Sequence, residues 1–131
     1  MLWFRIALGV LMLAHGVAHL PGLLASWRLA TFPEIPYHTT LLGGRIDVGD
    51  GGMRLVGALW LVAALAFGVA ALGAFQTRGW WTSAALAAAL GSLALCVTEW
   101  PAARIGVFVN VAIVGAVLLG QRAFWAASAA R

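Results

Sequence analysis

Four long apolar runs limit this chain to one class of fold. They cover residues 3–27, 53–75, 80–100 and 104–125. A helix rises about 1.5 Å per residue, so each run is long enough to cross a hydrocarbon layer about 30 Å thick. Only 9% of the 131 residues are charged, whereas soluble domains carry about 25%. The sequence therefore predicts an all-α integral membrane protein, with residues 1–131 forming a single domain built as a bundle of four transmembrane helices.

The boundaries of these spans are supported by residues that favour the membrane interface. Six of the seven tryptophans fall near a predicted helix end, where their amphipathic rings are most stable, and Trp60 alone falls inside a span. Pro21 predicts a kink in the far third of the first helix, because proline lacks a backbone N–H donor. Residues 28–52 form a long loop that is rich in glycine and proline. Loops of this length are usually functional or disordered.

Charge indicates a lipid environment and excludes nucleic acid as a partner. The eight basic residues are all arginine and occur singly near the ends of the apolar runs, so no basic stripe exists for a nucleic acid to bind. Single arginines at these places anchor helices at the lipid head groups. The first run is too long for the core of a signal peptide. We expect a multi-pass protein of a bacterial cytoplasmic (inner) membrane, with the termini inside and the long loop outside.

The first helix carries an ionisable pair at membrane depth. His15 and His19 are one helical turn apart and share a face with Met12, while the opposite face is apolar. Ionisable groups cost several kcal/mol inside a bilayer, so such a pair marks a functional site by default. The two histidines are therefore predicted to face the other helices.

The topology brings further polar residues to the same half of the bundle. The end of the first helix, the long loop, the end of the third helix and the start of the fourth must all meet on one side. We therefore predict a ligand-binding site in the bundle made by His15, His19, Glu99 and Asn110. The loop above it contributes His38, Asp47 and Asp50.

Several chemistries are compatible with this set of residues. Histidine and carboxylate can act as an acid/base pair, or His15, His19 and Glu99 can bind a transition metal. The segment His15-Gly16-Val17-Ala18-His19 has the spacing of H-E-x-x-H but lacks its glutamate, which excludes a zinc peptidase.

A purely structural interpretation competes with these chemistries. The histidines would then hydrogen-bond to Asn110 or Ser92 and hold the helices together. Glu99 would pair with Arg104 or cap nearby backbone. Asp47 and Asp50 would serve as turn and cap residues. Cys96, the only cysteine, is expected to be a buried packing residue.

The pattern of Arg5, Gly9, His15-Gly16 and His19, followed by a long loop and three closely spaced spans, resembles the DoxX-like small four-helix bacterial membrane proteins. It is also similar to an uncharacterised bacterial group whose first helix carries HGxxH. The resemblance implies a redox accessory role linked to quinones. We therefore expect a protein that binds a lipophilic small molecule such as a quinone. The alternatives are a non-catalytic subunit of a larger membrane complex or homo-oligomer, and a metal-binding protein. The sequence does not decide whether the chain is an enzyme.

Overall fold

The computed structural model describes residues 2–129, with side chains through residue 122, and its long elements are all helices. The first span is divided into α1 (Leu2–Val17) and α2 (Leu20–Ser26). It is followed by α3 (Gly49–Phe75), α4 (Trp81–Thr98) and α5 (Arg104–Ala129). Within the described residues, four helical segments are long and apolar enough to cross a membrane, counting α1 and α2 as one. The predicted all-α architecture with four such helices is confirmed.

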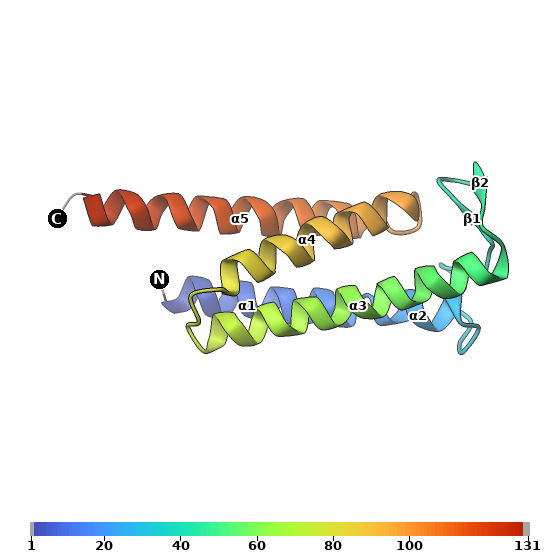
Figure 1. The fold of residues 1–131 in the computed structure, drawn as a ribbon, viewed down its shortest axis with the longest axis horizontal. Helices are drawn as coiled ribbons and strands as arrows, with labels where there is room; N and C mark the ends of the chain where they lie inside the picture. Colours follow the sequence, from blue (N-terminus) through green and yellow to red (C-terminus); the bar gives the residue numbers. More distant parts are fainter. Residues whose placement is uncertain (1, 130–131) are drawn as a thin grey trace.

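The helices lie side by side along the long axis of the molecule (Figure 1). α1 and α2 pack on α3, α3 packs on α4, α4 packs on α5, and α5 returns to touch α1. The start of α1, the end of α5 and the α3–α4 turn lie at one end, here called the terminal end (Figure 1). The long connection before α3 and the α4–α5 turn lie at the other, here called the loop end (Figure 1).

The first span is interrupted close to the predicted kink. α1 ends at Val17, and α2 begins at Leu20 with Pro21 in its first turn. A proline is tolerated there because the first N–H groups of a helix have no partner within the helix. The break places His19 between the two helices, as the N-cap residue of α2 with right-handed helical backbone angles.

The long connection contains a small hairpin that the sequence did not predict. β1 (Thr40–Leu41) pairs antiparallel with β2 (Ile46–Asp47). The turn between them uses positive φ angles at Gly43 and Gly44, which glycine adopts without strain. The Leu42 N–H donates to the Thr98 carbonyl oxygen at 2.8 Å, which ties the hairpin to the end of α4.

The helix that follows starts earlier than expected. α3 begins at Gly49 instead of residue 53, so the glycine-rich stretch is partly helical. Glycine weakens the interior of a helix but costs less in the first turn, where the backbone N–H groups have no helical partners. The predicted loop at residues 28–52 is correspondingly shorter. α5 continues to Ala129, beyond the predicted end at residue 125.

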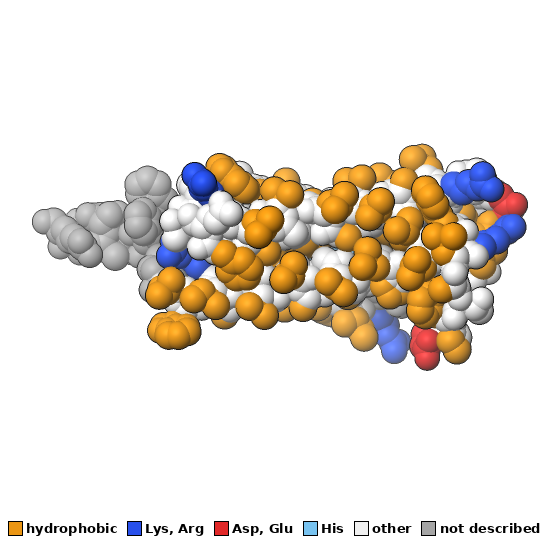
Figure 2. All heavy atoms as spheres, turned by 90° about the horizontal axis from the view of Figure 1, so that it is seen from below, with side chains coloured by type: hydrophobic (Ala, Val, Ile, Leu, Met, Phe, Trp, Pro, Cys, Tyr) orange, Lys and Arg blue, Asp and Glu red, His pale blue; other side chains and the backbone are white. Residues whose placement is uncertain are grey.

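The apolar residues divide between a tight interior and an exposed outer surface. Alanines fill much of the interior near Phe67, which is fully buried. At Gly16, α1 approaches α3 so closely that an added Cβ would lie 3.0 Å from the backbone oxygen of Ala64. Hydrophobic side chains cover the outside along the length of the bundle, and the charged groups lie toward its two ends (Figure 2). This distribution suits a helical bundle surrounded by lipid.

Candidate functional site

The two histidines of the first span take part in a buried hydrogen-bond network. His15 Nε2 lies 3.2 Å from Asn110 Oδ1 on α5. Asn110 Nδ2 donates to Ser92 Oγ on α4 at 2.9 Å. His19 Nε2 lies 2.6 Å from the same hydroxyl, and His19 Nδ1 lies 2.7 Å from the carbonyl oxygen of His15. The network therefore connects the first span to both α4 and α5.

Each residue of this network donates a hydrogen bond to the next one around a ring. A carbonyl oxygen only accepts, so His19 donates its Nδ1–H to His15 O, and His15 donates its Nε2–H to Asn110 Oδ1. In a neutral His19 ring with its proton on Nδ1, Nε2 accepts a hydrogen bond from the Ser92 hydroxyl, which in turn accepts from Asn110 Nδ2. The ring closes with each imidazole carrying one proton, and every hydrogen bond in it is made. The predicted cross-helix bonds to Asn110 and Ser92 are both present.

A second polar pair lies at the loop end. Glu99 follows the last residue of α4, and its side chain is only 8% exposed. Its Oε2 lies 3.3 Å from His38 Nε2 in the long connection. Within the described part of the chain, Glu99 Oε1 and His38 Nδ1 are buried and have no hydrogen-bond partner. The structural interpretation paired Glu99 with Arg104. In the structure its partner is His38.

Burial changes the chemistry of this carboxyl group. Removal from solvent raises the pKa of Glu99, because the charged form loses hydration, and the nearby imidazole of His38 partly opposes that shift. The carboxyl group therefore keeps its proton to a higher pH than an exposed glutamate does. It can donate or accept a hydrogen bond, depending on its protonation.

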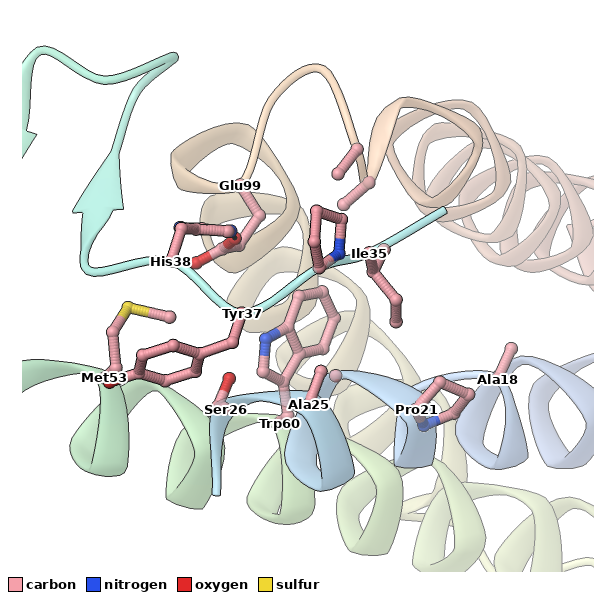
Figure 3. A pocket seen from close by; sticks show the side chains of 14 residues that line it. Ala18, Pro21, Ala25, Ser26, Ile35, Tyr37, His38, Met53, Trp60 and Glu99 are labelled. Carbon is pink, nitrogen blue, oxygen red and sulfur yellow. Dashed lines mark ion pairs between the residues drawn. The ribbon is translucent and has the colours of Figure 1, made fainter. Parts of the chain in front are cut away.

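The His38–Glu99 pair borders a cavity of about 140 Å³, here called the loop-side cavity. Figure 3 shows His38 and Glu99 directed toward each other on one side, with Trp60 and Pro21 across from them. A neighbouring cavity of about 200 Å³, the histidine cavity, is lined by His15 and His19. The two cavities share four lining residues: Ala18, Trp60, Ala102 and Ala103.

The loop-side cavity also adjoins the outside of the molecule. His38 and Glu99 line both this cavity and an outer cleft of about 790 Å³ beside the long connection. On the apolar outer surface of the bundle, Ile105 lines the histidine cavity and is 72% exposed. The cavities are therefore bordered both by the loop end and by this apolar outer surface.

The two aspartates of the predicted site lie in the connection and line neither of these cavities. Asp47 Oδ1 accepts from the Gly49 N–H at 2.9 Å, which lowers the pKa of that carboxyl. Asp50 is in the first turn of α3, where it binds Arg28 at 2.5 Å and the hydroxyl of Tyr37. The hydrogen bond to Asp50 raises the pKa of Tyr37. The aspartates thus fix the shape of the connection, and Asp50 contacts side chains instead of capping backbone.

The predicted metal set is not assembled. Glu99 pairs with His38, while His15 and His19 bond to Asn110 and Ser92. Among the described residues, no three His, Cys, Asp or Glu side chains are grouped so that they could hold a metal ion. The seven residues predicted for one site therefore form a buried ring, a His–Glu pair and two loop contacts.

Sequence reasoning missed two residues that shape the site. Tyr37 lines the loop-side cavity, and the guanidinium of Arg28 lies 4.1 Å from the centroid of its ring. Trp60 is the largest of the four residues that line both cavities. Its position was the one available signal, since the other tryptophans fall near predicted span ends.

The chain was compared with protein-family models, with curated proteins and with solved structures, and it matches none of them. The geometry of the site is therefore the basis for its interpretation.

Proposed function

We propose that this chain is a multi-pass protein of a bacterial cytoplasmic membrane that binds a lipophilic small molecule. The ligand is a ring with hydrogen-bonding substituents, such as a quinone or quinol head group, held in the loop-side cavity. The observation that carries this proposal is Glu99 Oε1, a buried carboxylate oxygen with no partner among the described residues, at the wall of that cavity. Buried polar atoms are nearly always hydrogen-bonded, so an orphaned one needs an explanation.

The size and lining of the cavity favour a small, mostly apolar ligand. Its volume of about 140 Å³ is close to that of an engineered cavity of about 150 Å³ that binds benzene. Apolar walls with a few polar groups are typical of small-molecule sites. A single ring fits this space, and an attached hydrocarbon tail would leave through the histidine cavity past Ile105 to the lipid.

The His–Glu pair supplies the recognition chemistry. As a carboxylate, Glu99 would accept the proton of a ring hydroxyl. As a carboxylic acid, it would donate to a ring carbonyl. Its raised pKa makes both forms accessible, which is the property that proton exchange with a bound ligand requires. His38 holds the other carboxylate oxygen in place.

The closed ring of hydrogen bonds favours a different role for His15 and His19. Each member of the ring is bonded to the next, so these histidines serve the bundle as ties between helices. This observation supports the second candidate, a non-catalytic subunit of a larger membrane complex, in which the polar residues only hold the helices together.

Ligand titration separates the two candidates. The purified protein in detergent would be titrated with a short-chain benzoquinol, and binding would be followed by tryptophan fluorescence quenching and native mass spectrometry. Ala18→Leu places bulk at the wall shared by both cavities. Ala14→Leu is the matched control, because Ala14 is exposed one turn earlier on α1 and lines neither cavity.

We expect Ala18→Leu to abolish binding and Ala14→Leu to leave it unchanged. Glu99→Gln should weaken binding by about 10- to 150-fold, because a hydrogen bond to a charged group contributes about 1.5–3 kcal/mol. Asn110→Leu breaks the ring, so it should lower the melting temperature while folded protein still binds the quinol. The ligand site would be refuted, and the accessory subunit favoured, if the parent protein did not bind the quinol. The same would follow if Ala18→Leu and Glu99→Gln both bound it as tightly as the parent does.

A further inference from the structure

A separate cavity at the terminal end has the chemistry of an anion site. Its volume is about 470 Å³, and it lies between the start of α1, the α3–α4 turn and α5. The polar residues that line it are Arg5, Thr77, Arg78, Thr82 and Gln121. None of them contributes to the loop-side cavity or the histidine cavity.

Among the described residues, no carboxylate pairs with either arginine of this cavity. Arg5 Nε is buried and has no hydrogen-bond partner in the part of the chain that the structure describes. Arg78 Nε donates to Gln76 Oε1 at 3.2 Å, a neutral partner. Ion pairs among the described residues involve neither arginine.

The acidic residues are far from this cavity along the fold. All four of them lie in the long connection, in the first turn of α3 or at the end of α4: Glu34, Asp47, Asp50 and Glu99. The visible face of the molecule accordingly has only basic charge at the terminal end and both signs at the loop end (Figure 2). The cavity therefore holds one exposed arginine and one half-buried arginine, and the four acidic residues lie at the other end of the molecule.

The start of α4 adds to the positive potential. α4 begins at Trp81 with no side-chain cap, and Thr82 in its first turn lines the cavity. The free N–H groups and the dipole of an 18-residue helix favour an anion at this end. The hydroxyl of Thr82 and the amide of Gln121 are further hydrogen-bond donors.

From these observations we propose that the terminal cavity binds a phosphate-bearing anion, of which the head group of an anionic phospholipid is the form present in a membrane. Arginine binds phosphate oxygens through paired N–H groups, and basic pockets between membrane helices accept anionic head groups. The apolar part of the lining, with Phe4 and Val117, would contact the attached glycerol and acyl chains.

Native mass spectrometry of the full-length protein in detergent tests this site. The protein would be titrated with phosphatidylglycerol, with phosphatidylcholine of the same acyl chains, and with phosphatidylglycerol in the presence of inorganic phosphate. The variants are Arg78→Gln, which changes an exposed residue, and Arg5→Gln. Arg45→Gln is the control, because it removes the same charge from an exposed residue of the hairpin turn at the loop end.

We expect phosphatidylglycerol to bind more tightly than phosphatidylcholine. Each terminal-end variant should lose about fivefold in affinity, the factor that corresponds to about 1 kcal/mol per arginine near a membrane surface. Arg45→Gln should bind as the parent does. Competition by inorganic phosphate would assign the site to the phosphate group alone, and no competition would assign it to the whole lipid.

Equal binding of the two lipids would overturn the proposal. So would a loss in Arg45→Gln as large as that in Arg78→Gln, because binding would then follow net charge and not this cavity. Arg78 is at the surface, so Arg78→Gln tests the proposal even if Arg5→Gln does not fold.

Discussion

At the scale of single residues, the protonation state of Glu99 decides the chemistry of the loop end. Its side chain is nearly buried, and one carboxylate oxygen faces His38 while the other is unpaired among the described residues. The ring that contains Asn110 and Ser92 is the opposite case, because none of the buried side-chain atoms without a partner in the described residues belongs to it. An incompletely bonded buried group costs stability, and that cost is tolerated where a ligand completes the bonding.

The raised pKa of Glu99 predicts how stability depends on pH. The carboxyl ionises near its ordinary value of 4.5 in the unfolded chain and at a higher pH in the folded protein. Between these two values the Glu99 carboxyl binds more protons in the folded state, so its contribution to stability is fully present below about pH 4.5 and is lost as the pH rises through its folded pKa. Glu99→Gln should remove that decline, as measured by the melting temperature in detergent across the pH range.

The same substitution at Glu34, an exposed glutamate of the same connection, is the control. Glu34→Gln should keep the pH profile of the parent protein. The prediction would be wrong if the melting temperature of the parent protein did not decline over this pH range. It would also be wrong if Glu99→Gln showed the same decline as the parent, because ionisation of Glu99 would then not be the cause.

Residue roles were predictable from the sequence where helical geometry alone fixed them. The i, i+4 spacing of His15 and His19 placed both on the inner face, and the order of the spans brought them near Asn110. The pairing of Glu99 with His38 was not predictable, because it depends on the path of the long connection. That path is fixed by Arg28, Tyr37 and Asp50, which are distant in sequence and have no periodic pattern.

At the scale of elements, close approach of α1 and α3 positions the histidines. Gly16 lies between His15 and His19 in the sequence, and its lack of a side chain allows the backbones of α1 and α3 to approach closely. Small residues are favoured at such contacts, because helix association in lipid depends on packing and not on removal of water. The apolar runs predicted the helices well, since length and composition determine them. The hairpin was missed because two-residue strands have too few residues for an alternating pattern.

Replacement of glycine by alanine at two helical positions tests this contact. At Gly16 a Cβ would lie 3.0 Å from Ala64 O and 3.1 Å from Phe67 Cβ, whereas at Gly68 nothing lies within 4 Å. Alanine favours a helix over glycine by about 1 kcal/mol at both positions. Overpacking costs about 1–3 kcal/mol and applies only at Gly16. Thermal unfolding followed by circular dichroism should therefore give a lower melting temperature for Gly16→Ala than for Gly68→Ala. A higher melting temperature for Gly16→Ala than for Gly68→Ala would mean that the α1–α3 contact can accommodate an added methyl group.

At the scale of the whole molecule, the two ends differ in charge and in shape. The loop end carries the acidic residues, the hairpin and the proposed ligand cavity. The terminal end carries arginines around the proposed anion site that form no ion pair with another described residue. Between them the surface is apolar over the length of helices long enough to cross a bilayer. With the helices side by side and the turns alternating between the ends, insertion would place the hairpin and the α3–α4 turn on opposite sides of the membrane.

Labelling of introduced cysteines tests this arrangement. Arg45 lies in the hairpin turn and Gln76 at the end of α3, and both are exposed. With the termini inside, a membrane-impermeant maleimide should label Arg45→Cys in intact spheroplasts and label Gln76→Cys only after permeabilisation. The parent chain is the blank, because its single cysteine, Cys96, is 1% exposed. Labelling of both variants from one side would contradict four crossings. Labelling of Gln76→Cys alone would keep the crossings and reverse the orientation, which would put the anion site on the outer face and the ligand cavity on the inner one.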